Sequence, residues 1–258
     1  MEIFNPDTGL PVLLRALHVL AGVTWIGLLY YFNVVQVPSF AAYGEEGKAR
    51  NISIDKLARR ALWWFRWASV VTLGFGLLIV GVPNEAGVSY MKDFMSGNGE
   101  NILPKNAAIF VGMVLGILMA ANVWMVIWKN QKVVLANAAN VLGGGEADAG
   151  APAAGRRALL ASRQNFIFSF SMLWFMVGAA HLYDKSAFDV VESSRAWTFV
   201  IVCLVISAIL ELNCLGKLGG TAATNKLLWP YESHKNALIT GGVLFVVLYV
   251  LSEILLKA

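Results

Sequence analysis

The chain has 258 residues, of which 58% are hydrophobic and 14% charged, and its mean hydropathy is +0.64. Soluble globular domains contain about 25% charged residues, so the composition predicts an integral membrane protein. The net charge of +4 follows from the placement of basic loops described below and gives no reason to expect a nucleic-acid partner.

Six continuous apolar runs are each long enough to cross the roughly 30 Å hydrocarbon core as a helix. A backbone in hydrocarbon must satisfy its own hydrogen bonds, so the runs predict an all-α fold, a bundle of six transmembrane helices in one domain over residues 1–258. The predicted spans are 11–37, 61–82, 107–128, 166–183, 197–215 and 237–256.

The loops that follow the first, third and fifth spans carry thirteen of the twenty Lys and Arg residues, and the opposite side carries five. Because basic loops stay in the cytoplasm, both termini are predicted outside. The predicted location is a bacterial inner (cytoplasmic) membrane, with both termini in the periplasm. The inner basic residues are Lys48, Arg50, Lys56, Arg59, Arg60, Lys129, Lys132, Arg156, Arg157, Arg163, Lys217, Lys226 and Lys235.

Two long connections separate the spans. The outer loop over about 83–105 has room for a short interfacial helix at 88–95. The inner loop over about 133–157, rich in Gly and Ala, is predicted to be a flexible linker.

Two histidines lie inside apolar segments and are the first candidates for chemistry. Measured from the outer ends of their spans, His18 lies about 10 Å deep in the first span and His181 about 5 Å deep in the fourth. Both therefore lie on the same side of the membrane. Histidine in hydrocarbon is costly and usually functional. The pair suits axial ligation of a haem b iron; a mononuclear metal or proton-transfer role, or packing with a hydrogen bond, are the alternatives.

A glycine shares a helix face with each histidine. Gly22 follows His18 by four residues, and Gly178 precedes His181 by three. Both are predicted to belong to the cofactor site, because they would let a flat macrocycle approach the backbone. Small residues also allow ordinary close packing of membrane helices.

Polar residues form a second group near the predicted inner face. An intramembrane arginine needs a partner, and Glu211 lies at a suitable depth to pair with Arg66. The group could hold an anionic substrate or cofactor propionates, conduct protons, or act as a structural clamp. Its members are Arg66, Asn122, Arg163, Asn165 and Glu211.

Several motifs within residues 11–183 carry a family resemblance. They are Leu17-His18 with Gly22, Trp25-Ile26-Gly27, Trp64-Phe65-Arg66-Trp67, Met119-Ala120-Ala121-Asn122-Val123 after Gly116, Asn130-Gln131-Lys132, and Ser162-Arg163-Gln164-Asn165 leading to His181. Together they resemble the membrane domain of the bacterial cytochrome-c-linked urate oxidase (urate hydroxylase) family.

The resemblance implies a membrane redox protein, an oxidoreductase or electron-transfer subunit, that passes electrons outward to a c-type cytochrome. Urate is the substrate of that family, and its cytochrome c domain is not among these 258 residues. The positions that match the family are His18, Trp25, Arg66, Asn122, Asn130, Gln131, Arg163, Asn165 and His181.

Three functions follow from these patterns. The first is a membrane redox protein with haem b between the first and fourth spans. The second is a cofactor-free accessory subunit of a larger respiratory or oxidase complex, in contact with its subunits and with the lipid bilayer. A transporter is disfavoured, since the prolines lie at the ends of the spans or outside them.

Overall fold

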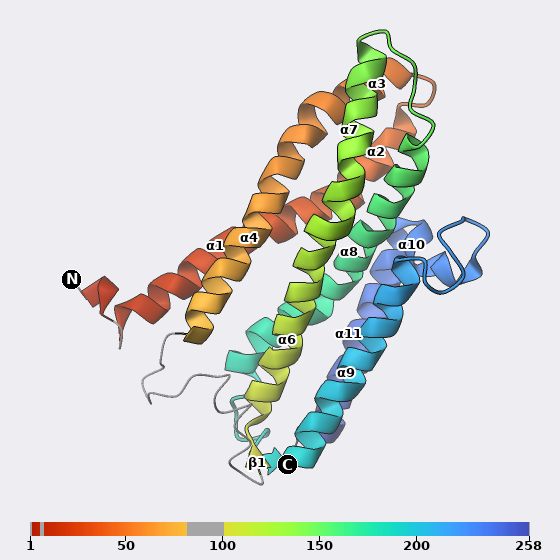
Figure 1. Cartoon of the computed structure of the whole chain (residues 1–258). Coiled ribbons are helices and arrows are strands. Elements are labelled where there is room, and N and C mark those ends of the chain that lie inside the picture. The colour runs from red at the N-terminus through yellow and green to blue at the C-terminus, as the bar shows by residue number, and fades with distance from the viewer. Residues whose placement is uncertain (1, 6–7, 82–100, 258) are drawn as a thin grey trace.

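The structure, a computed structural model, describes residues 2–5, 8–81 and 101–257 (Figure 1). Within them the regular secondary structure is helical apart from one pair of two-residue strands. Most of the expected outer loop, including the helix expected at 88–95, lies outside the described residues.

The first half of the chain forms long helices that each contain a π-helical stretch. In the first, α1 (Gly9–Tyr30) continues through η2 (Tyr31–Gln36) into α2 (Val37–Ala42). In the second, α3 (Gly47–Ile52) continues through η3 (Ser53–Ala58) into α4 (Arg59–Gly81). In the third, α6 (Pro104–Ala121) continues through η4 (Asn122–Ile127) into α7 (Trp128–Leu142).

The second half contains α8 (Ala151–His181), α9 (Ser193–Cys214) and α11 (His234–Leu255) as its long helices. Shorter elements are the 3-10 helices η1 (Glu2–Phe4) and η5 (Lys226–Leu228), the single turn α10 (Trp229–Glu232), and the strands β1 (Asn101–Ile102) and β2 (Val191–Glu192). The strands pair antiparallel, with Ile102 opposite Val191.

The described residues contain five helices that are long and apolar enough to cross a membrane: Gly9–Ala42, Gly47–Gly81, Pro104–Leu142, Ser193–Cys214 and His234–Leu255. The chain is therefore a multi-pass membrane protein whose apolar helices contact lipid. These five helices overlap five of the six predicted spans.

The remaining predicted span falls in α8, which is a largely buried helix. It packs against α6, α7, α9 and α11, and more than half of its 31 residues are buried. Large rings such as Phe166, Phe168 and Phe175 belong to its buried side chains. A helix enclosed by other helices meets little lipid, which explains how α8 accommodates Gln164 and Asn165 in its middle.

The inner connection is much shorter than expected. Helix α7 runs to Leu142 and α8 begins at Ala151, so the flexible linker predicted over 133–157 is reduced to residues 143–150. Alanine, leucine and arginine favour helix in the flanking parts. Gly144, with a φ of +87°, adopts the left-handed conformation in which a side chain would be strained.

A glycine also ends α9. The Gly216 N–H donates to the Asn213 oxygen and the Lys217 N–H to the Leu212 oxygen, which is the hydrogen-bond pattern of a Schellman motif. Gly216 has a φ of +75°, as that motif requires.

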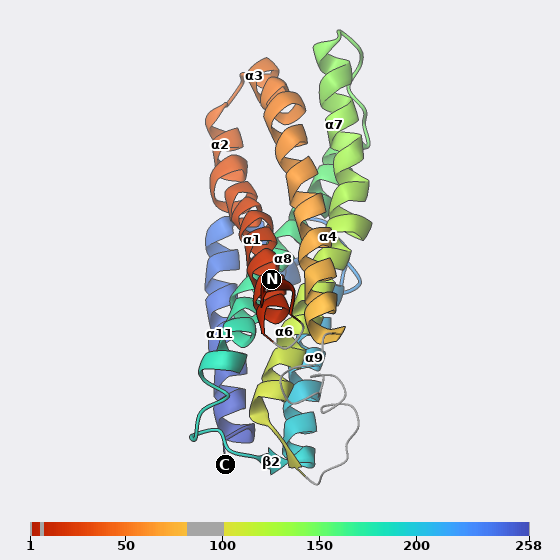
Figure 2. The same ribbon diagram turned by 90° about the vertical axis from the view of Figure 1, so that its left-hand side faces the viewer.

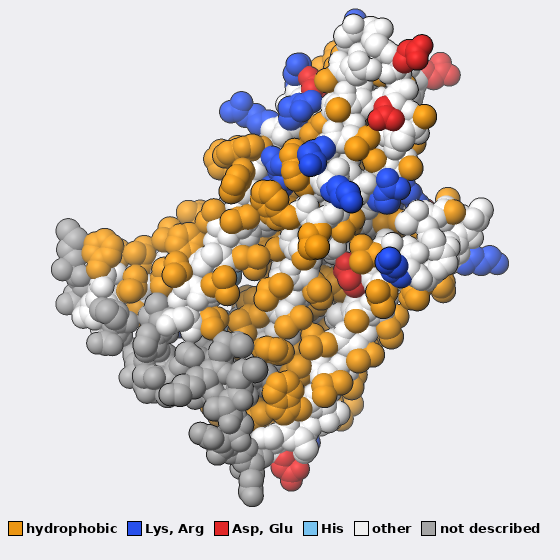
Figure 3. Space-filling view, viewed as in Figure 1, with side chains coloured by type: hydrophobic (Ala, Val, Ile, Leu, Met, Phe, Trp, Pro, Cys, Tyr) orange, Lys and Arg blue, Asp and Glu red, His pale blue; other side chains and the backbone are white. Residues whose placement is uncertain are grey.

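Helices α1 and α4 pack side by side and lean away from α6, α8, α9 and α11 toward the end of the bundle that carries the N-terminus (Figures 1 and 2). The opposite end holds α2, α3 and the end of α7. Lys and Arg side chains gather toward that end, above an apolar belt (Figure 3). We call it the basic end.

Candidate functional site

His18 lies between α1 and α4. Its Nδ1 is 2.8 Å from the main-chain oxygen of Thr72, and a Cβ atom added to Gly76 would be 3.3 Å from its Cε1. The missing side chain at position 76 thus makes room for the imidazole. Because Nδ1 is bound to a carbonyl, it carries the proton in the neutral ring, and Nε2 is the nitrogen left for a ligand.

The structure does not bring His18 and His181 into contact. His181 is exposed at the last turn of α8 and has no hydrogen-bond partner in the described part of the chain. The first long helix instead contacts α8 through Tyr30 of α1, whose hydroxyl is 3.1 Å from the Ser169 hydroxyl, and through Asn33 of η2, which donates to the Ser162 hydroxyl at 2.9 Å.

The two glycines expected to receive a macrocycle face protein side chains. A Cβ at Gly178 would lie 3.1 Å from the ring of Tyr183, and one at Gly22 would lie 3.9 Å from the Thr72 methyl group. Tyr183 folds back on α8, and Gly22 faces α4. At Gly178 the Tyr183 ring therefore fills the space that was expected to receive a macrocycle.

Three residues of the predicted polar group do meet. The Asn122 amide donates to the Asn165 oxygen at 3.0 Å and to Glu211 Oε2 at 3.0 Å, while the Asn165 amide donates to the Met119 oxygen at 2.8 Å. We call Asn122, Asn165 and Glu211 the amide–carboxylate cluster. It ties η4, α8 and α9 together, and it contains no basic side chain that could pair with an anionic substrate.

Arg66 is not part of that cluster. Its guanidinium lies 3.2 Å from the ring centroid of Trp128 and 5.7 Å from that of Trp124, and its Nε donates to the Leu62 oxygen at 3.1 Å. The predicted clamp with Glu211 is wrong, because aromatic faces stabilise this cation where a carboxylate was expected.

Arg163 lies apart from both the amide–carboxylate cluster and Arg66. It is buried and donates to the main-chain oxygen of Tyr231, whose own hydroxyl donates to the Leu210 oxygen at 3.0 Å. Arg163 therefore secures α10 against α8. The five polar residues predicted as one group serve three separate helix contacts.

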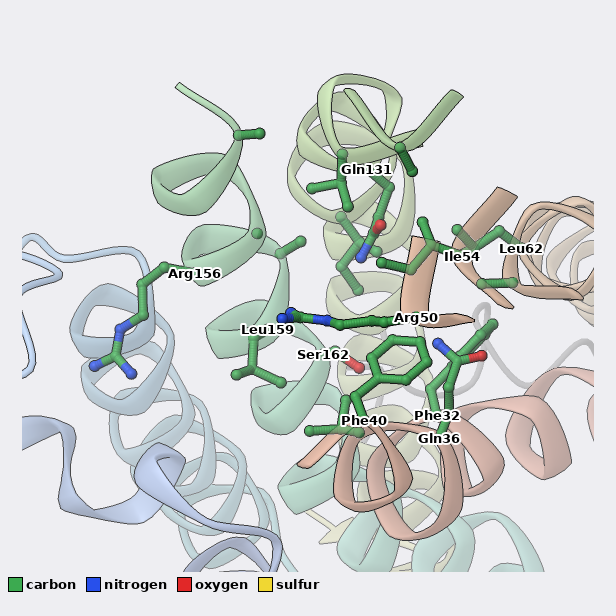
Figure 4. Close-up of a pocket in the computed structure, with 18 of the residues that line it drawn as sticks. Phe32, Gln36, Phe40, Arg50, Ile54, Leu62, Gln131, Arg156, Leu159 and Ser162 are labelled. Carbon is green, nitrogen blue, oxygen red and sulfur yellow. The ribbon is translucent and has the colours of Figure 1, made fainter. Parts of the chain in front are cut away.

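A cavity at the basic end was not predicted (Figure 4). It has a volume of about 720 Å³ and is lined by Arg50 and Gln36, with Gln131 and Ser162 across from them. Of these, Gln131 and Ser162 stood out in the sequence, within the Asn130-Gln131-Lys132 and Ser162-Arg163-Gln164-Asn165 motifs. Arg50 is one of many basic loop residues, and nothing in its spacing distinguishes it from Lys48.

No family model, curated protein or solved structure matched this chain in comparisons with known proteins. The described residues also contain no group of three or more His, Cys, Asp or Glu side chains placed to hold a metal ion.

Proposed function

We propose that this membrane protein is a redox protein that holds haem b through His18 and passes electrons to a periplasmic c-type cytochrome, with α8 as its sixth span. The order of motifs that resembles the urate oxidase membrane domain motivates the redox assignment. Bound haem b would supply reversible one-electron chemistry at its iron.

The observation that carries the proposal is the hydrogen bond between His18 Nδ1 and the Thr72 oxygen. Histidines that ligate metals usually donate their second ring N–H to a carbonyl or carboxylate, which fixes the tautomer and orients the ring. His18 has this arrangement, so it fits the role of a residue that would hold the haem iron through Nε2.

His181 is assigned as the second residue that would hold the haem. Its ring is exposed and free of hydrogen bonds within the described residues, so no existing contact would have to break for it to bind iron.

A reduced-minus-oxidised visible spectrum of the purified protein tests this proposal. The wild type should show a sharp haem-b band, the His18→Ala variant should lose it, and the His181→Ala variant should lose the low-spin form. His234→Ala is the matched control, because His234 begins α11 near the basic end. A featureless wild-type spectrum from haem-replete cells would overturn the proposal.

An accessory role in a larger respiratory or oxidase complex is the second candidate. One face of α1 exposes Val12, Val19 and Val23, each more than 60% accessible, and this face can meet lipid or another subunit. A colourless protein that co-migrates with a respiratory complex in mild detergent, and separates from it when Val19 and Val23 are changed to Arg, would favour this role.

A further inference from the structure

We propose that the cavity at the basic end binds an amphipathic anion, with its carboxylate or phosphate group on Arg50 and its long apolar body reaching toward Phe65. This site is separate from the histidines and does not depend on the proposed redox function.

The charge of the cavity favours an anion. Its lining includes two arginines, Arg50 and Arg156, and no Asp or Glu. Arg156 is already paired with Glu232, and Figure 4 shows it directed away from the centre. Arg50 lies across the middle, beside the Phe40 ring at 5.8 Å, and has no carboxylate partner among the described residues.

A second hydrogen-bond donor for an anion lines the cavity together with Arg50. The Ser162 hydroxyl accepts from Asn33 at 2.9 Å and retains its own proton to donate. Figure 4 shows Ser162 facing the end of the Arg50 side chain.

All three π-helical stretches of the described chain contribute to the lining. Phe32 and Gln36 come from η2, Ile54 and Ala58 from η3, and Ile127 from η4. A π-helical turn costs hydrogen-bond geometry and is found frequently at functional sites. Its recurrence in three helices around one cavity indicates that the backbone is shaped to keep this space open.

The polarity of the lining changes along the cavity. Arg50 and Leu62 lie on one continuous helix, twelve residues and therefore about 18 Å apart. The distant end is apolar: the rings of Phe32 and Phe65 pack edge to face at 5.5 Å, and Leu62 and Ile127 complete it. A small hydrophilic anion would leave this end unfilled, whereas a long-chain amphiphile would bury its tail there.

The experiment uses the full chain in phosphatidylcholine nanodiscs and measures saturable binding of radiolabelled dodecanoate above that of empty nanodiscs. Arg50→Gln should weaken binding by roughly tenfold or more, because a charge-assisted contact is lost. Lys48→Gln is the matched control, because it removes the same charge from the same helix α3 but does not line the cavity. Size exclusion and thermal unfolding confirm that each variant is folded.

A second variant fills the cavity without touching its charge. A Cβ at Gly155 would meet only the Val134 methyl group, at 3.6 Å, so Gly155→Leu is tolerated by the backbone and should abolish binding. If Gly155→Leu binds dodecanoate like the wild type, the anion is held at the surface and the proposal fails. It also fails if Arg50→Gln binds normally or if the wild type shows no saturable binding.

Two further arms define the ligand. Dodecyltrimethylammonium, which has the tail but a positive charge, should not compete with dodecanoate. Inorganic phosphate should compete only weakly, because it has no tail. Equal competition by phosphate would overturn the amphipathic assignment. Replacing phosphatidylcholine with phosphatidylglycerol distinguishes the sources of the anion. Loss of dodecanoate binding in those nanodiscs identifies a membrane lipid as occupant, and unchanged binding identifies a free long-chain acid.

Discussion

The guanidinium of Arg66 stacks on the indole of Trp128, with 3.2 Å between the guanidinium carbon and the ring centroid. A cation that rests on an aromatic face needs no carboxylate, and this explains how an arginine resides in α4 without an ion pair. The planar guanidinium matters here, because an ammonium group does not stack in the same way.

We expect Arg66→Lys to lower the free energy of unfolding by about 1 kcal/mol, since it keeps the charge but loses the stacking. A double-mutant cycle with Trp128→Leu, measured by thermal unfolding in detergent, should show coupling of similar size. Combination with Glu211→Gln should be additive. Coupling to Glu211 and none to Trp128 would restore the ion pair expected from the sequence.

The fit of the His18 ring against Gly76 predicts different effects of two nearby glycines on one helix. A Cβ at Gly74 meets nothing within 4 Å, whereas one at Gly76 crowds the His18 ring. Alanine otherwise favours helix over glycine. Gly76→Ala should therefore be less stable than Gly74→Ala by about 1 kcal/mol in the same unfolding measurement; equal stabilities would show that His18 does not occupy this position.

The amide–carboxylate cluster should contribute to stability through buried hydrogen bonds. Asn122→Ala removes two of its hydrogen bonds and leaves the Asn165 oxygen and Glu211 without this donor, so we expect a loss of about 1–3 kcal/mol. The control is Asn140→Ala, because the exposed Asn140 donates to the Glu146 oxygen at 2.7 Å. Comparable losses for both variants would argue against a special role for the cluster.

The ion pair between Arg156 and Glu232 gives a pH dependence of stability. The hydrogen bond from Arg156 holds the pKa of Glu232 below its ordinary value of 4.5. Because the pKa is lower in the folded state, the contribution is present above pH 4.5 and is lost as the pH falls through the folded-state value.

Glu232→Gln should remove this dependence, so that the stability difference from wild type shrinks below pH 4.5. Both side chains are partly exposed, so the effect at neutral pH should stay within about 1 kcal/mol. Unfolding curves recorded from pH 3 to 7 test the sign. A difference that grows on acidification would contradict the assignment.

Hydrophobic length determined most of the fold from the sequence. Five of the predicted spans coincide with long apolar helices, because about twenty apolar residues in a row have no other stable arrangement in lipid. The predicted length of the linker around Gly144 was too large, because the alanine- and asparagine-containing segments at its ends are helical and pack against neighbouring helices.

The site followed from the sequence only in part. Depth along a helix is readable from residue number, and it grouped Asn122, Asn165 and Glu211 correctly. Depth says nothing about direction around the helix axis. Arg66 was assigned to Glu211 at a matching depth, yet the rotation of α4 directs it onto Trp128.

The sequence by itself thus determined that this protein lies in a membrane as a set of helices, because the transfer of a segment into lipid depends on the composition and length of that segment. Only the tertiary structure decided which side chains meet. Thr72 and Gly76 lie against His18. Arg50, Gln36 and Ser162 come from three separate helices and line one cavity. Such contacts depend on the rotation of each helix about its axis and on the angle at which helices cross. The local sequence around a residue carries no signal of either quantity.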